Sequence, residues 1–154
     1  MRQPWLRRIV PAVLVVGLCA STAAAADFKF GARLGYYTDA GEPFLGVEGL
    51  FRMAHRIYFN PNLEWVLVDN VKYFTLNADA HYDFPTHGHY YLWAGGGLAI
   101  ISVDPDGPVE GNTDLGVNFL AGIGLKRKGL IPYFQAKLIA KDGTEFVIAF
   151  GVRF

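Results

Sequence analysis

Cysteine is almost missing from this 154-residue chain, and its one copy, Cys19, lies near the N-terminus. Beyond residue 26 there is none, which excludes disulfides, thiol catalysis and cysteine-based metal sites from that part. The same part has a single serine, Ser102, and no segment whose apolar residues recur with helical spacing. The whole chain has a formal net charge of zero, so its composition predicts no nucleic-acid partner. Its length suits one domain.

Residues 1–26 have the three parts of a secretory signal peptide. A basic head with three arginines precedes an uncharged apolar run, 9–18, and small residues ending in Ala24-Ala25-Ala26 follow. As a helix, the run is too short to cross about 30 Å of hydrocarbon. We therefore expect cleavage after Ala26 and a mature domain of residues 27–154. All 14 acidic residues but only 11 of the 14 basic ones follow residue 26, which gives the mature domain a formal charge of −3.

Eight segments of the mature domain alternate between apolar side chains and polar or small ones, the period of two that is typical of β-strands. Most have the length of a tilted membrane-spanning strand, roughly 9 to 11 residues. Pro61 lies inside the third segment, and because proline cannot donate to a strand ladder we expect a bulge or break over 60–62. The fifth segment is rich in glycine, and its inward positions stay undetermined. The segments are 28–36, 45–53, 57–67, 72–82, 90–101, 114–125, 132–138 and 146–154.

The two faces of these strands differ in charge. Of the charged residues in these segments, only Lys72 falls on the apolar face, near a strand end. The other charged residues lie on the polar face, together with small residues that are mostly glycine. The interior of an eight-stranded barrel is just wide enough for side chains to fill it. Small and charged residues therefore suit the inside, and bulky aromatics suit a lipid-facing outside. We predict an all-β fold, an eight-stranded antiparallel up-and-down transmembrane β-barrel. The polar face carries Lys29, Arg33, Glu48, Arg52, Glu64, Asp79, Asp114, Lys137 and Arg153.

Charges inside such a barrel are buried, and buried charges have to be paired. If the first hairpin turns near residues 40 and 41, Arg33 lies opposite Glu48. We therefore expect a network of ion pairs that fills the lumen and leaves no open pore. Its predicted members are Arg33, Glu48, Arg52, Glu64, Asp79, Asp114, Lys137 and Arg153.

Aromatic residues lie toward the ends of the segments, as in the two aromatic girdles of a membrane barrel. With the N-terminus on the periplasmic side, one girdle is predicted at the periplasmic rim and the other at the outer rim. The first comprises Phe28, Phe30, Phe51, Phe59, Tyr82, Tyr90 and Phe154, and the second comprises Tyr36, Phe44, Trp65, Phe74 and Phe146.

The last segment, 146–154, alternates apolar residues and ends in phenylalanine. It resembles the terminal strand of bacterial outer-membrane proteins, and 132–137 is similar to the penultimate strand of small eight-stranded barrels of the OmpX/OmpA type. The resemblance implies a place in the outer membrane of a Gram-negative bacterium, surrounded by outer-membrane lipid. It also implies that the barrel assembly machinery reads a C-terminal signal formed by Ile148, Phe150, Val152 and Phe154.

The function that we expect is a structural or surface-interaction role without enzymatic activity, cofactor or metal, in a monomer. The predicted outer loops, 38–43, 69–70, 104–112 and 141–145, are short, which argues against a large binding surface on the cell exterior. A cation bound by the acidic loop 104–112 is a weaker alternative.

Two other classes of protein stay open. A lipid-modifying enzyme of the outer membrane needs a hydroxyl nucleophile beside an imidazole. Ser102, however, falls at the outer end of its segment, and the four histidines map to the periplasmic half. The other class is a soluble periplasmic barrel that carries a lipid in an apolar interior. A metal site of His81, His87 and His89 is a weaker possibility.

Overall fold

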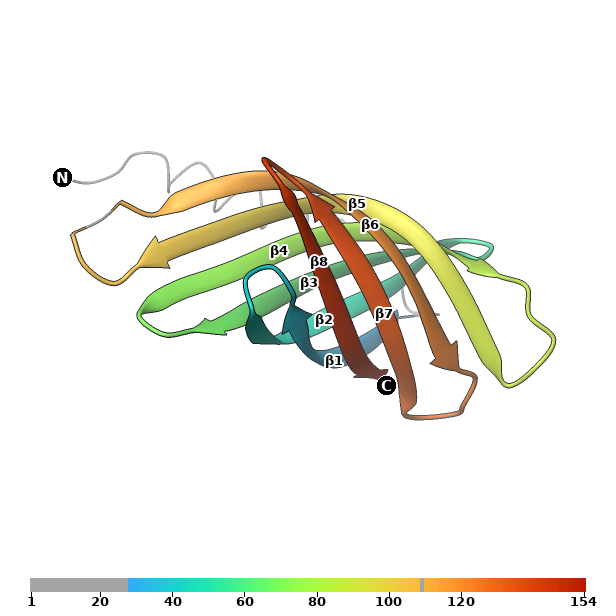
Figure 1. Ribbon diagram of the computed structural model, residues 1–154. Coiled ribbons are helices and arrows are strands. Elements are labelled where there is room, and N and C mark those ends of the chain that lie inside the picture. Colours follow the sequence, from blue (N-terminus) through green and yellow to red (C-terminus); the bar gives the residue numbers. More distant parts are fainter. Residues whose placement is uncertain (1–27, 109) are drawn as a thin grey trace.

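The computed structural model describes residues 28–108 and 110–154, so the predicted signal peptide lies outside the described residues. The described chain is a single closed barrel of eight strands, in which each strand pairs antiparallel with the next and β1 also pairs with β8 (Figure 1). The predicted eight-stranded antiparallel architecture is confirmed. The strands are β1 (Phe28–Tyr37), β2 (Glu42–Ala54), β3 (Ile57–Val68), β4 (Val71–Phe84), β5 (Tyr90–Pro105), β6 (Asn112–Leu125), β7 (Ile131–Ala140) and β8 (Thr144–Arg153).

The barrel has two ends, which we name by the chain segments that they hold. The termini end holds Phe28, Phe154 and the β2–β3, β4–β5 and β6–β7 connections, and the distal end holds the other four hairpins. One wall is taller, because β4, β5 and β6 have 14, 16 and 14 residues whereas β1, β7 and β8 have 10 each (Figure 1). Among the described residues, no helix is long and apolar enough to cross a membrane.

The fifth strand extends further than its sequence pattern predicts. The alternation fades after Ile101, but the ladder with β4 continues until Pro105 stands opposite Val71. The distal connection predicted over 104–112 therefore shrinks to 106–111. Burial also settles the phase of this strand, since Trp93, Ala99 and Ile101 are buried and point into the barrel.

The first hairpin corrects one predicted pairing. Its four-residue turn, 38–41, ends at Gly41, whose φ of 73° suits glycine. The turn is centred between residues 39 and 40, so Arg33 pairs with Gly46 and Glu48 pairs with Gly31. The prediction that Arg33 lies directly opposite Glu48 is wrong. The two residues are diagonal neighbours, which the long arginine side chain can still join.

Pro61 does not break its strand. The ladder between β2 and β3 skips the positions around Pro61 and resumes in the same register, and the one register shift lies between Arg52 and Ala54. Proline has no N–H to give to the neighbouring strand. The side-chain amide of Asn60 instead donates to the carbonyl of Gly49 at 2.8 Å, which is the residue that the register places opposite Pro61. The predicted irregularity is thus a local loss of pairing without a break.

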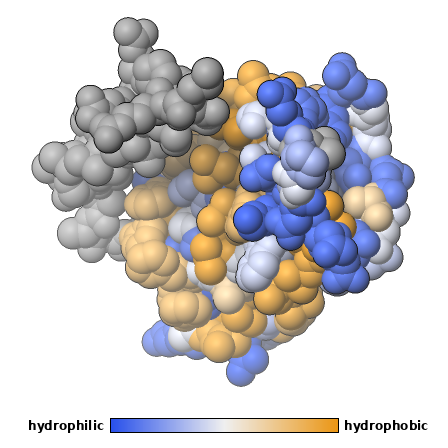
Figure 2. Space-filling model, turned by 90° about the vertical axis from the view of Figure 1, so that its left-hand side faces the viewer, coloured by the Kyte–Doolittle hydropathy of each residue, from blue (hydrophilic) through white to orange (hydrophobic). Residues whose placement is uncertain are grey.

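Apolar and polar residues are distributed inside out compared with a soluble protein. Large apolar side chains on the outward positions are exposed, for example Val47, Leu98 and Leu115 with 60%, 63% and 76% of their surface accessible. Figure 2 shows broad apolar patches on one side of the barrel next to a group of polar residues. The inward positions alternate with these and are largely buried. Fourteen buried residues are polar or charged: Arg33, Glu48, Asn60, Asn62, Glu64, Thr75, Asn77, Asp79, His81, Asn118, Gln135, Lys137, Glu145 and Arg153.

Candidate functional site

A chain of five alternating charges crosses the middle of the barrel interior. Arg153 Nε donates to Glu48 Oε1 at 2.7 Å, and Arg33 Nη1 lies 3.5 Å from Glu48 Oε2. The other side of the Arg33 guanidinium lies 3.3 Å from Glu64 Oε1. Lys137 Nζ then donates to both oxygens of Glu64, at 2.9 and 2.8 Å. The charged groups are completely or almost completely buried, so each carboxylate pairs with two cations where water does not solvate them.

Asp79 joins the same layer through amides. Its two carboxylate oxygens accept from Asn62 Nδ2 at 3.0 Å and from Asn118 Nδ2 at 2.7 Å. Asn77 links the two asparagines, since it donates to Asn62 and accepts from Asn118, both at 2.9 Å. Three carboxylates and three cations thus share one buried layer, and its formal charge is zero. Sequence reasoning missed these asparagines, although their inward positions in the period-two pattern could have indicated them.

Two predicted members of the lumen network lie away from it. Arg52 is exposed near the termini end of β2, beside the register shift. Asp114 is partly buried near the distal end of β6, where it accepts from Asn112 Nδ2 at 2.9 Å. Both residues occupy inward positions, but each lies toward an end of its strand, at a different height from the layer of buried charges.

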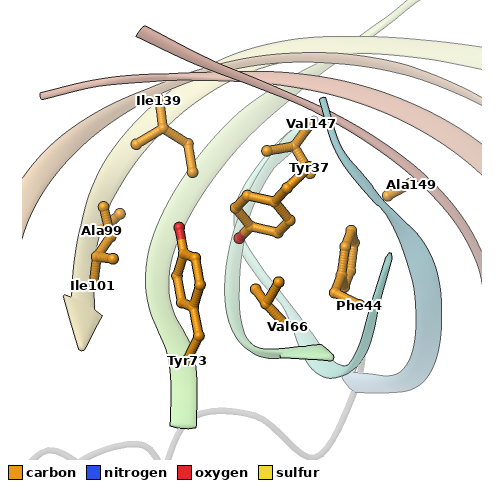
Figure 3. Close-up of a cluster of buried hydrophobic side chains, with 9 residues drawn as sticks. All are labelled: Tyr37, Phe44, Val66, Tyr73, Ala99, Ile101, Ile139, Val147 and Ala149. Carbon is orange, nitrogen blue, oxygen red and sulfur yellow. The ribbon is translucent and has the colours of Figure 1, made fainter. Parts of the chain in front are cut away.

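An apolar cluster fills the distal half of the interior (Figure 3). Phe44 lies inside it with 1% of its surface exposed, so its predicted place in the outer girdle is wrong. The reason is strand parity: Leu45 and Val47 of the same strand point outward, which turns Phe44 inward. The Tyr37 hydroxyl connects this cluster to the charges, because it donates to Glu64. The cluster comprises Tyr37, Phe44, Val66, Tyr73, Ala99, Ile101, Ile139, Val147 and Ala149.

Aromatic rings hold the last arginine at the termini side of the charged layer. The guanidinium carbon of Arg153 lies 4.2 Å from the centre of the Tyr133 ring and 5.1 Å from that of Trp93. Glycines make room for these rings, since a Cβ on Gly122 would lie 2.1 Å from Trp93 and one on Gly151 would lie 2.4 Å from Tyr133. Cation–π contacts of a desolvated cation contribute about 2 kcal/mol, so the rings stabilise a charge that water does not reach.

The residues considered for catalysis and metal binding are not brought together. Ser102 pairs with Phe74 in the distal part of β5, and His81 lies seven residues further along β4, which is about 23 Å of strand. His81 is buried against Tyr58 and Trp93, with ring centres 5.7 Å from each. Within residues 28–108 and 110–154, no group of three or more His, Cys, Asp or Glu side chains is arranged to hold a metal ion.

Comparison with known proteins relates this architecture to solved structures. No protein-family model and no curated protein matches the sequence. The N-terminal β-barrel domain of Pseudomonas aeruginosa OprF matches with a TM-score of 0.72 and 15% identity, over 82% of this chain and 95% of that one. The chain has the fold of the small eight-stranded outer-membrane barrels.

Two further structures with this outer-membrane barrel fold support the assignment. Neisserial surface protein A (NspA) matches with a TM-score of 0.65 and 16% identity, over 82% of this chain and 95% of that one. Ail, the attachment invasion locus protein of Yersinia pestis, matches with a TM-score of 0.54 and 10% identity, over 82% and 96%. The resemblance to small outer-membrane barrels that the sequence indicates is thus confirmed at the level of the fold.

Proposed function

We propose that the mature protein is an integral barrel of the outer membrane of a Gram-negative bacterium, with a structural or surface-interaction role and no enzymatic activity. The observation that carries the proposal is the inverted partition of side chains. Bulky apolar residues are exposed all around the wall, while fourteen polar or charged residues are buried inside. In water, such a surface would associate or aggregate. In a bilayer it is the surface that lipid requires, because Lys or Arg on the lipid side costs about 2–4 kcal/mol at the midplane.

The lumen of this barrel is closed. The charged layer, the distal cluster and the aromatic rings around Arg153 occupy successive heights of the interior. A solute that crossed the barrel would have to separate Arg33 from Glu48 and Glu64, and breaking a buried pair costs about 3–5 kcal/mol. Purified protein in planar bilayers should therefore show no steady conductance of porin size, and such a conductance would contradict the closed lumen.

Assembly depends on the C-terminal strand in this proposal. Phe150 and Val152 of β8, and Phe154 directly after it, present alternating side chains on the lipid face. Phe150 and Phe154 are exposed over 51% and 64% of their surface. Phe154 also closes the barrel, since its N–H donates to Phe30 O at 2.9 Å and its carbonyl accepts from Phe30 N at 3.1 Å. The barrel assembly machinery is the proposed partner that reads this strand.

Membrane fractionation tests the proposal against a soluble lipid-carrying barrel. The protein should sediment with outer membranes and be extracted only by detergent. On a gel, the folded form should migrate faster without boiling than with it. Recovery of the mature protein in the soluble periplasmic fraction would contradict the membrane assignment. Lipid hydrolysis by the purified protein would contradict the non-enzymatic role.

A further inference from the structure

A hollow opens at the termini end of the barrel, and we call it the vestibule. Two adjoining depressions of about 330 and 230 Å³ form it, and they share Asp83, Tyr91 and Lys126. Five basic side chains line it: Arg56 and Lys126 in the first depression, and Lys29, Lys126, Arg127 and Arg153 in the second. Their only acidic companion in the lining is Asp83, so the vestibule has an excess of positive charge.

The vestibule lies at the positive pole of a barrel with strongly separated charges. In the described part of the chain, the strand ends and connections of the termini end carry one acidic residue and six basic ones outside the charged layer. Those of the distal end carry nine acidic residues and two basic ones. The basic residues are Lys29, Arg52, Arg56, Lys126, Arg127 and Lys128, and the acidic ones of the distal end are Asp39, Glu42, Asp69, Asp104, Asp106, Glu110, Asp114, Asp142 and Glu145. An anion is therefore attracted to the termini end.

The floor of the vestibule holds a buried donor without a partner. Arg153 has none of its surface exposed and lines the second depression. Its Nε binds Glu48 and its Nη1 donates to the Tyr91 hydroxyl at 3.3 Å, but its Nη2 has no hydrogen-bond acceptor among the described residues. A buried N–H group of a charged side chain costs stability unless it is satisfied. An oxyanion on this floor would be attracted by the positive charge of Arg153.

The walls between the basic groups are apolar. Leu50, Tyr58, Tyr91 and Ile131 line the second depression beside its lysines and arginines. Aromatic and aliphatic walls with a few convergent polar groups are typical of small-molecule sites. A simple inorganic ion would leave these walls without contacts, whereas a ring or short chain would cover them.

We propose that the vestibule binds a small anion that carries one phosphate or carboxylate group on an apolar body. The anionic group lies between the side chains of Lys126 and Arg127, over the floor that Arg153 forms, and the apolar body packs on Tyr91 and Tyr58. The same chemistry is offered by a free solute and by a phospholipid headgroup. The proposal goes beyond the structural role and does not depend on that role, because anion binding can be measured directly on the detergent-solubilised barrel.

Phenyl phosphate is the probe, and the indole N–H resonance of Trp93 is the reporter. The indole ring of Trp93 stacks on Tyr91 at 5.1 Å and lies over Arg153, so a bound anion changes its surroundings. The protein is expressed as the full chain, labelled with ¹⁵N, purified in detergent and titrated. The resonance is assigned by its loss in Trp93→Phe. We expect a saturable shift, with inorganic phosphate at least tenfold weaker than phenyl phosphate because it lacks the apolar body.

Single charge changes in one connection provide matched variants. Lys126→Gln and Arg127→Gln should each weaken phenyl phosphate binding at least fivefold, because both residues line the vestibule. Lys128→Gln removes the same charge from the neighbouring exposed position, which is not part of the lining, and should change the affinity less than twofold. Absence of a saturable shift, or equal losses in all three variants, would overturn the proposal.

Nanodiscs separate the two sources of the ligand. If the vestibule takes a lipid headgroup, phosphatidylglycerol nanodiscs should shift the Trp93 resonance of the wild type and lower its affinity for added phenyl phosphate. Neither effect should occur in Arg127→Gln. If it takes a free solute, phenyl phosphate binds equally well in phosphatidylglycerol and phosphatidylcholine nanodiscs. Either result supports an anion site in the vestibule, and loss of phenyl phosphate binding in both lipids would contradict it.

Discussion

Lys137 Nζ lies 2.8 and 2.9 Å from the two carboxylate oxygens of Glu64, and both side chains are withdrawn from water. The two residues come from β7 and β3, strands on different sides of the closed sheet, and they are 73 positions apart in the chain. The contact therefore ties opposite walls together through the lumen. Because Glu64 also forms an ion pair with Arg33, the Lys137–Glu64 pair is connected to the rest of the buried charges.

Replacing Lys137 by methionine should destabilise the barrel by about 3 kcal/mol, because it leaves a buried carboxylate with one cation fewer. The double variant Glu64→Gln with Lys137→Met should recover most of that loss, since it removes one charge of each sign and keeps the layer neutral. Urea unfolding of the protein in lipid vesicles, monitored by the gel mobility of the folded form, measures the free energy of unfolding of both variants. A double variant as unstable as the single one would show that the charges do not act as a pair.

Gly122 should not tolerate a larger residue while Trp93 is present. A Cβ at this position would lie 2.1 Å from the indole ring, and overpacking costs about 1–3 kcal/mol. We expect Gly122→Ala to lower the free energy of unfolding by that amount, and Trp93→Leu in the same chain to reduce the penalty. Gly143→Ala is the matched control, because a Cβ there meets nothing within 4 Å. Equal effects of the two alanines would contradict close packing of the indole on Gly122.

Phe154→Ala should impair assembly in cells more than it impairs the folded barrel. The Phe154 side chain is 64% exposed, and its backbone bonds to Phe30 do not need the ring. The expected result is less heat-modifiable protein in the outer membrane, with normal refolding of purified protein into detergent. Phe134→Ala, an outward phenylalanine of β7 with 47% exposure, serves as the control and should assemble normally. Normal assembly of Phe154→Ala would refute the proposed role of the terminal residue.

The strands and their inward faces could be predicted because a membrane barrel repeats one local rule. Successive side chains of a strand point alternately to lipid and to the lumen, so their polarity alternates with a period of two along the sequence. Arg33, Glu48, Glu64, Lys137 and Arg153 were placed inside on this rule alone, and the structure brings them into contact. The outward placement of Phe44 rests instead on its aromatic ring and its place near a strand end, and it is wrong because the alternation set by Leu45 and Val47 turns Phe44 inward.

The heights of the inward side chains along the barrel axis could not be predicted. They depend on the register of every ladder around the closed ring, and a turn centred one residue earlier shifts the pairing of the first hairpin by two positions. The sequence therefore could not indicate that Asp114 lies distal to the charged layer or that Asp79 meets Asn62 and Asn118 there. The vestibule has the same origin, since its lining comes from all eight strands and from three connections.

Two tryptophans on opposite faces of the wall allow the most direct test of the central claim, that the exposed apolar face of the wall contacts lipid and that the side chains in the lumen are shielded from it. Trp65 points outward with 49% of its surface exposed, whereas Trp93 points inward and is 1% exposed. The protein is reconstituted into vesicles that contain brominated phospholipid, once as Trp93→Phe and once as Trp65→Phe. The account predicts strong quenching of Trp65 fluorescence and little quenching of Trp93. Equal quenching of both tryptophans, or stronger quenching of Trp93, would contradict it.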